Sequence, residues 1–157
     1  MNGISTFLWF DDCALEAAEF YVSVFPNSRL AGSGTFEDER PGQEQSVTAV
    51  SFELDGRPFG AINGGPLFSF TPAISFVVSC HDQDEIDHYW QRLCDGGQPG
   101  RCGWLVDRFG VSWQVVPAAL GDLLGGPDAE GSARASAAML QMGKFDIAAL
   151  LAAYDGR

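Results

Sequence analysis

Residues 102–117 read Cys-Gly-Trp-Leu-Val-Asp-Arg-Phe-Gly-Val-Ser-Trp-Gln-Val-Val-Pro and form the clearest structural pattern in the chain. Two apolar runs flank residues 107–110, and the Asp and Gly there favour the backbone angles of a tight turn. The pattern predicts a β-hairpin that ends at Pro117, which has no N–H for the ladder. Alternate residues of its second strand lie on opposite faces: Val111, Trp113 and Val115 on one, Ser112, Gln114 and Val116 on the other.

Gln114 is a polar residue among apolar neighbours. A buried amide needs a hydrogen-bond partner, so Gln114 either meets one in the core or faces a cavity. This residue is therefore the first candidate for a binding site.

Composition limits the kind of protein. A length of 157 residues suits one domain or a pair of small half-domains. The formal net charge of −12 argues against nucleic acid and anionic membrane surfaces as partners, because both select basic patches. None of the four cysteines belongs to a C-x-x-C pair, so a zinc or thioredoxin-like motif is not indicated. With no signal peptide and no apolar run of membrane-spanning length, a cytoplasmic, reduced protein is predicted.

The first part of the chain reads as a strand, a helix and three strands, at residues 4–10, 14–25, 29–36, 47–54 and 58–63. Asp12 is predicted to cap the helix. The apolar stripe of the helix is expected to include Leu15, Ala18, Val22 and Phe25, widened by Phe20, Tyr21 and Val24. Glycines in the third segment suggest a bulge, and residues 37–44 suggest an exposed acidic loop. The pair Asp55-Gly56 predicts the turn between the last two strands.

The same order then begins again, with a spacing of about seventy residues. A strand at 74–80, a helix at 85–93 and a short strand within 97–101 precede the hairpin at 102–117. Ile4-Ser5 matches Ile74-Ser75, and Asp11-Asp12 matches His81-Asp82. Neither unit is large enough to bury its sheet alone, so the two are expected to pack together.

After Pro117 the chain becomes helical, with a short turn at 120–124 and helices at 133–142 and 146–154. We therefore expect one α+β domain over 1–157, built from tandem βαβββ modules with a C-terminal helical extension. The first module spans 1–66, the second 73–117 and the helical tail 118–157.

Several motifs together resemble the PhnB-like family, which also carries the label "3-demethylubiquinone-9 3-methyltransferase". They lie at 7–11, 20–21, 52–56, 63–66, 70–76, 102–105, 109–117 and 139–142. That family belongs to the vicinal oxygen chelate, or glyoxalase/bleomycin-resistance, superfamily. The resemblance implies paired modules whose sheets curl around a cleft, usually in a homodimer. It does not specify a reaction, and the sequence shows no glycine fingerprint of an S-adenosylmethionine-dependent methyltransferase of the doubly wound type.

Metal-using relatives in the superfamily place a ligand on the first and the last strand of each module. Their first-strand ligand lies seven residues before the Asp that opens the helix, which gives Ser5 and Ser75 here. Their last-strand ligand falls on Gln114 in the second module and on or near Asn63 in the first. These neutral side chains are poor metal ligands, so the resemblance implies a cleft without a metal or another cofactor.

We expect this cleft to bind a small organic molecule of unknown identity through Ser5, Trp9, Asn63, Ser75, Trp104 and Gln114. The polar members could instead be satisfied core groups, and the tryptophans could be core packing. Two other functions stay open: a metal-independent enzyme that uses Glu53 or Asp107 as acid or base, and a ligand-free dimer that acts through partners. The sequence assigns no catalytic residue.

Overall fold

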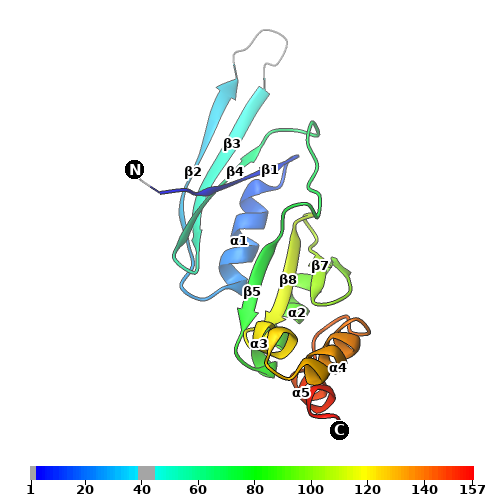
Figure 1. The fold of residues 1–157 in the computed structure, drawn as a ribbon. Helices are drawn as coiled ribbons and strands as arrows, with labels where there is room; N and C mark the ends of the chain where they lie inside the picture. Colours follow the sequence, from blue (N-terminus) through cyan, green and yellow to red (C-terminus); the bar gives the residue numbers. More distant parts are fainter. Residues whose placement is uncertain (1–2, 39–44) are drawn as a thin grey trace. The chain divides into compact units, whose positions relative to one another are not determined.

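A computed structural model describes residues 3–38 and 45–157 of the chain (Figure 1). The chain divides into two compact units, Met1–Ser69 and Phe70–Arg157. The elements of the first unit are β1 (Thr6–Phe10), α1 (Ala14–Val24), β2 (Arg29–Asp38), β3 (Gln45–Leu54) and β4 (Arg57–Asn63). Those of the second are β5 (Phe76–Cys80), α2 (Gln83–Cys94), β6 (Gln98–Pro99), β7 (Trp104–Val106) and β8 (Ser112–Pro117), followed by α3 (Leu120–Gly125), α4 (Ala129–Met139) and α5 (Ile147–Asp155).

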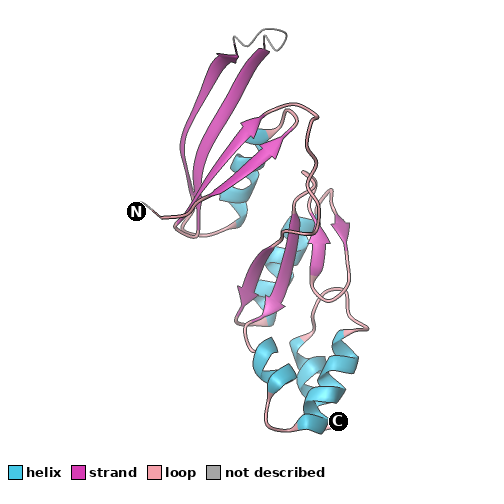
Figure 2. Cartoon of the chain, turned by 45° about the horizontal axis from the view of Figure 1, so that its top comes forward, coloured by secondary structure: helices cyan, strands magenta, loops and turns pink. Residues whose placement is uncertain are grey.

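Each unit contains one four-stranded sheet with a helix on one face (Figure 2). The strand orders, β1-β4-β3-β2 and β5-β8-β7-β6, are the same arrangement. The first and last strands of each module pair in parallel, and the other neighbours are antiparallel. The predicted fold class, tandem βαβββ modules with a C-terminal helical extension, is confirmed.

Helix α1 packs on its sheet through a stripe of small and aromatic residues: Ala14, Ala17, Ala18, Tyr21 and Val24. The Tyr21 ring stacks on the Phe52 ring of β3, with centroids 6.5 Å apart. Of the predicted stripe, Ala18, Tyr21 and Val24 are buried as expected. The prediction was wrong at Leu15, which is 37% exposed, and it missed Ala17, which is fully buried. Burial of the sheet face under α1 removes Leu8, Phe10 and Phe52 from water, which is the main stabilising contribution in this module.

Both predicted turns are present. Asp55 and Gly56 have φ values of 48° and 71°, the positive values that a two-residue hairpin turn of type I′ requires. In the second module, Asp107 Oδ1 accepts hydrogen bonds from the backbone N–H groups of Phe109 and Val111. Its other oxygen accepts from Trp113 Nε1 at 2.8 Å, so this buried carboxylate fixes both the turn and the indole beneath it.

The ends of several elements differ from the sequence prediction. β1 and β5 begin at Thr6 and Phe76, two residues later than expected, so Ser5 and Ser75 precede the strands. The predicted bulge is found in β2 between Leu30 and Gly32. Helix α4 begins earlier than predicted because Asp128 caps it, accepting from the Gly131 N–H at 3.0 Å. Residues 37–38 continue β2, and the remainder of the predicted acidic loop, 39–44, lies outside the described residues.

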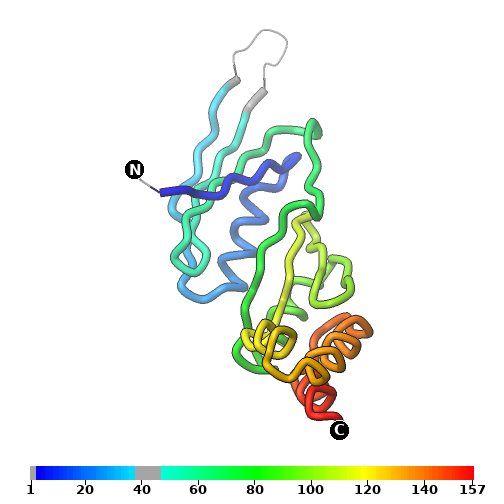
Figure 3. Tube along the Cα trace, viewed as in Figure 1, coloured from blue at the N-terminus to red at the C-terminus, as the bar shows by residue number. Residues whose placement is uncertain are grey.

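The tail returns to the second module after α4, and the Cα trace passes beside the start of the hairpin (Figure 3). The backbone N–H groups of Cys102 and Gly103 donate to the carbonyls of Met142 and Gly143, both at 2.8 Å. Phe145 is fully buried. A Cβ added to Gly103 would lie 2.6 Å from the Phe145 ring, so the glycine is needed for this close contact.

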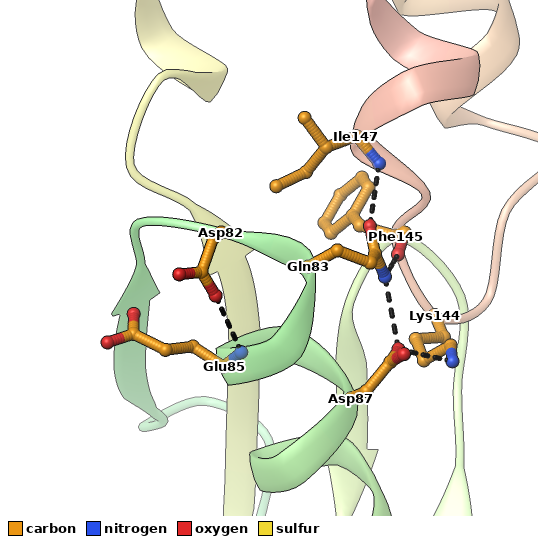
Figure 4. A network of polar contacts seen from close by, with 7 residues as sticks. All are labelled: Asp82, Gln83, Glu85, Asp87, Lys144, Phe145 and Ile147. Atoms are coloured by element: carbon orange, nitrogen blue, oxygen red, sulfur yellow. Dashed lines mark hydrogen bonds and ion pairs between the residues drawn. The ribbon is translucent and has the colours of Figure 1, made fainter.

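Gln83 at the start of α2 holds the same segment of the tail (Figure 4). Its amide nitrogen donates to Phe145 O at 3.0 Å, and its amide oxygen accepts from the Ile147 N–H at 2.9 Å. Asp87, one turn further along α2, accepts from the same amide and pairs with Lys144 at 2.5 Å. The tail is therefore an integral part of the second unit. No helix within the described part of the chain has the length and apolar content to cross a bilayer.

Candidate functional site

The open face of the second sheet, the face away from α2, contains a hydrogen-bonded pair of neutral polar residues. Gln114 lies in the middle of β8, and its amide nitrogen donates to Ser75 Oγ at 2.8 Å. Ser75 directly precedes β5, the parallel neighbour of β8. Two predicted site residues, 39 positions apart in the chain, are thus brought into direct contact.

Two more side chains flank Gln114 on this face. Register pairs Gln114 with Val77 of β5 on one side and with Trp104 of β7 on the other. Paired residues of neighbouring strands point to the same face of a sheet. Val77 is 60% exposed and Trp104 half-buried. The row Val77–Gln114–Trp104 therefore offers apolar surface on both sides of an amide. Val77 was missed from sequence, although the repeat spacing that matches Ser75 to Ser5 also matches it to Phe7.

The equivalent row of the first sheet is built differently. The pairing of β1, β4 and β3 places Phe7, Gly60 and Ser51 side by side. A Cβ at position 60 would lie 2.6 Å from the Phe7 ring, so the ring occupies the space where Gln114 projects in the second module. Phe7 itself is 64% exposed. The first open face is thus aromatic at the position where the second is polar.

Trp9 lies two residues beyond Phe7 on the same open face. Its indole N–H donates to Gly65 O at 2.9 Å, and its ring meets the Phe68 ring edge-on, with centroids 5.2 Å apart. A Cβ on Gly64 would come within 2.2 Å of the indole, so glycine is required there. Trp9 is therefore a positioned aromatic surface whose N–H is already used. Ser5 is exposed and precedes β1.

Asn63 has a local structural task. Its amide oxygen accepts from the Ala14 N–H at 2.7 Å, which satisfies one free donor at the start of α1. The predicted cap, Asp12, was wrong: the N-cap residue is Cys13, which makes no side-chain cap bond. Register pairs Asn63 with Phe10 and Pro117 with Cys80, so the position equivalent to Gln114 is Gly60 rather than Asn63. The sequence analysis placed this position on or near Asn63, three residues after Gly60.

The donor set does not suit a divalent metal. Ser5, Ser75 and Gln114 present hydroxyl and amide groups, whereas metals of this superfamily need imidazole nitrogens or carboxylates. Among the described residues, no group of three or more His, Cys, Asp or Glu side chains is arranged to hold a metal ion. Both histidines are exposed: His81 lies just before α2, and His88 lies within it.

Both candidate carboxylates are engaged by donors. Glu53 accepts from Arg29 through both oxygens, at 2.6 and 3.0 Å. Asp107 is buried and accepts from Trp113 and from two backbone N–H groups. These contacts give each carboxylate a structural partner.

The cysteines are all free thiols. Burial, reinforced by Glu85 and Asp82, raises the pKa of Cys80 to about 12. Burial also raises the pKa of Cys13 and of Cys94. Cys102 donates its S–H to Met139 O at 3.5 Å. A raised pKa suppresses the thiolate that a nucleophile requires, so Cys13, Cys80 and Cys94 are poor nucleophiles.

The fold agrees with comparisons to known proteins. The family model described as 3-demethylubiquinone-9 3-methyltransferase matches residues 2–116. The PhnB protein of Bacillus cereus, provisionally named a 3-demethylubiquinone-9 3-methyltransferase, is 34% identical, with a TM-score of 0.65 over 74% of this chain and 100% of that one. No curated protein gives a match.

More distant structures share the fold alone. A glyoxalase family protein from Bacillus cereus is 14% identical, with a TM-score of 0.52 over 74% of this chain and 94% of that one. A variant of the fosfomycin resistance protein FosX from Listeria monocytogenes, in complex with Mn(II) and a dihydroxypropylphosphonic acid, is 16% identical, with a TM-score of 0.50 over 73% and 91%. The molecule has the glyoxalase/bleomycin-resistance fold. Within it, the chain belongs to the PhnB-like, 3-demethylubiquinone-9 3-methyltransferase-labelled family. The family model ends before α3, so the motif at 139–142 lies beyond it.

Proposed function

We propose that the protein binds a small organic molecule on the open face of its second sheet without a metal. The observation that carries this proposal is the hydrogen bond from Gln114 to Ser75. Val77 and Trp104 lie on either side of Gln114 and add apolar surface. A few polar groups within an apolar surface are typical of small-molecule sites. The FosX structure, which holds a small phosphonic acid, illustrates ligand binding in the same fold.

In the first unit, taken by itself, Ser5 before β1 and Trp9 on β1 are proposed as ligand contacts. Trp9 would contribute a rigid ring, because Gly65 and Phe68 already fix its orientation. Asn63 is left out of the proposed site because its amide oxygen is bonded to the start of α1. The metal-free state is proposed from the chemistry of the donors, and no catalytic residue is proposed.

A thermal-shift screen of diverse small molecules tests the proposal, because binding to the native state raises the melting temperature. We expect some compounds to stabilise the wild-type chain, and Gln114→Ala to abolish that shift. Gln91→Ala, an exposed glutamine on α2, is the matched control and is expected to leave the shift unchanged. A screen without stabilising compounds, or an equal shift in Gln114→Ala, would contradict the proposed site. Stoichiometric metal in the purified protein by plasma mass spectrometry would contradict the metal-free state.

A second candidate function is a homodimer that acts through partners without a ligand. Phe7 and Val77 are 64% and 60% exposed on the open faces, and apolar surface of this kind is typical of contacts between proteins. Sedimentation velocity of the wild type and of a Phe7→Ser, Val77→Ser variant tests this. A wild-type dimer that the variant converts to monomer, combined with no ligand from the screen, would favour this function over the first.

A cytoplasmic location is also part of the proposal. The four free thiols suit a reducing compartment. Fractionation of cells that express the protein would test it, and recovery from an oxidising compartment would contradict it.

A further inference from the structure

The hydrogen bond between Ser75 and Gln114 leaves both donors and an acceptor on the open face. It uses one of the two N–H groups of Gln114 and one acceptor position of Ser75 Oγ. The Ser75 hydroxyl hydrogen and the second Gln114 N–H remain donors, and Gln114 Oε1 remains an acceptor. Within the described residues, none of these three groups has another hydrogen bond. If the Gln114 amide turns over, the pair still presents donors and an acceptor.

The surroundings of this pair are neutral. The neighbouring positions of the face on β5, β7 and β8 are Val77, Ser79, Trp104, Val106, Ser112 and Val116. An anionic ligand would need a cationic side chain, and a cationic ligand would need a carboxylate. The net charge of −12 further disfavours an anion. The chemistry of the face therefore matches an uncharged ligand.

A lactam or primary carboxamide matches the pair, because its adjacent C=O and N–H accept from the hydroxyl and donate to the amide oxygen. Val77 and Trp104 on either side suit an apolar, planar body attached to that group. We infer that the ligand of this face carries a neutral cis-amide edge, held by Ser75 and Gln114, on a planar apolar ring. This inference rests on the proposed function and names its ligand class.

Three probes of similar shape test the inference with the full ¹⁵N-labelled chain. Isoquinolin-1(2H)-one has the amide edge, its N-methyl derivative lacks the donor, and 1-naphthoate replaces the edge with an anion. Binding is followed by NMR through the Gln114 side-chain amide and the Trp104 indole N–H. We expect the lactam to shift both signals and to bind about tenfold more tightly than either other probe, since a lost donor leaves Oε1 unpaired.

Gln114→Leu removes the acceptor but keeps the size of the side chain. In this variant, followed through Trp104, the lactam and its N-methyl derivative are expected to bind equally. Gln91→Ala is expected to retain the full discrimination. Normal dispersion of the remaining signals shows that each variant is folded.

The outcomes separate the inference from the proposed function. Equal affinity of the lactam and its N-methyl derivative for the wild type, with shifts at Gln114 and Trp104, overturns the ligand class and leaves small-molecule binding at this face intact. Tighter binding of naphthoate does the same. If no probe shifts the Gln114 and Trp104 signals, the inference about the ligand class is overturned. If the stabilising compounds from the thermal-shift screen also leave these signals unchanged, the proposed site is contradicted as well.

Discussion

The two modules share one topology but use the middle of the open sheet face in opposite ways. In the first, Gly60 leaves room for the Phe7 ring, and the face is aromatic. In the second, the same position is Gln114, which donates to Ser75 and has Val77 and Trp104 on either side. A repeated fold thus keeps its core while a single strand position changes the chemistry of its surface. This agrees with the rule that function depends on sites rather than folds.

The largest expected effect concerns the tail, which only the second unit contains. Phe145→Ala removes a fully buried ring and is expected to lower the free energy of unfolding of this unit by about 4 kcal/mol. Hydrogen exchange, measured separately for residues 3–38 and 45–69 and for residues 70–157, would show faster exchange in the second unit. Leu140→Ala, a 54% exposed position in the same tail, is the control and should cost little. Equal effects of the two variants would mean that the tail does not depend on Phe145.

The hairpin turns give the next largest contrast. Asp107→Ala leaves the Trp113 indole N–H and two backbone N–H groups without their acceptor, and is expected to cost about 3 kcal/mol. Asp55→Ala, in the corresponding turn, forces alanine into a positive φ and is expected to cost only about 1 kcal/mol. Urea unfolding of both variants measures the difference. A cost for Asp107→Ala no larger than that for Asp55→Ala would contradict the role given to this carboxylate.

The two module helices are capped from different places. Asn63 reaches α1 from the end of β4, whereas Asp82 caps α2 from the adjacent position by accepting from the Glu85 N–H at 2.9 Å. Replacement of either residue by alanine is expected to cost about 1 kcal/mol. Asp12→Ala, the cap expected from sequence, should have almost no effect in the same unfolding experiment. A larger cost for Asp12→Ala than for Asn63→Ala would reverse this assignment.

The smallest effect is the pH dependence of the contact between α2 and the tail. Lys144, and then the Gln83 amide, lower the pKa of Asp87 below its ordinary value of 3.8. Because the pKa is lower in the folded than in the unfolded state, this stabilisation is present above pH 3.8 and is lost as the pH falls through the folded value. The difference in stability between the wild type and Asp87→Asn should therefore shrink on acidification. Lys144→Met should flatten the same dependence, and a difference that grows in acid would contradict this sign.

Local patterns predicted most of the fold. The turns at Asp55 and Asp107 and the order of elements depend on neighbouring residues, so the sequence displays them directly. Asn63 could not be identified as a cap in this way, because its partner Ala14 is 49 positions away and the contact depends on strand register. Register likewise decides that Gly60, and not Asn63, corresponds to Gln114.

The candidate site was predicted only in part, because some of its contacts depend on strand register. Gln114 was identified as a polar residue among apolar neighbours, and Ser75 from the ligand positions of metal-using relatives. The structure brings the two into contact. Val77 and the role of Phe7 over Gly60 depend on which residues pair across the sheet, and the hydrophobic pattern does not encode that pairing.

The backbone bonds from Cys102 and Gly103 to residues 142 and 143 have a consequence for synthesis on the ribosome. The first unit contains all of its own strands by residue 63, so every strand of its sheet is available while the rest of the chain is still being made. The second unit must wait, because the ring that fills its core arrives only at Phe145. A nascent chain halted near residue 120 would therefore contain every strand of both sheets. Its second unit would still lack Phe145, a buried part of its core.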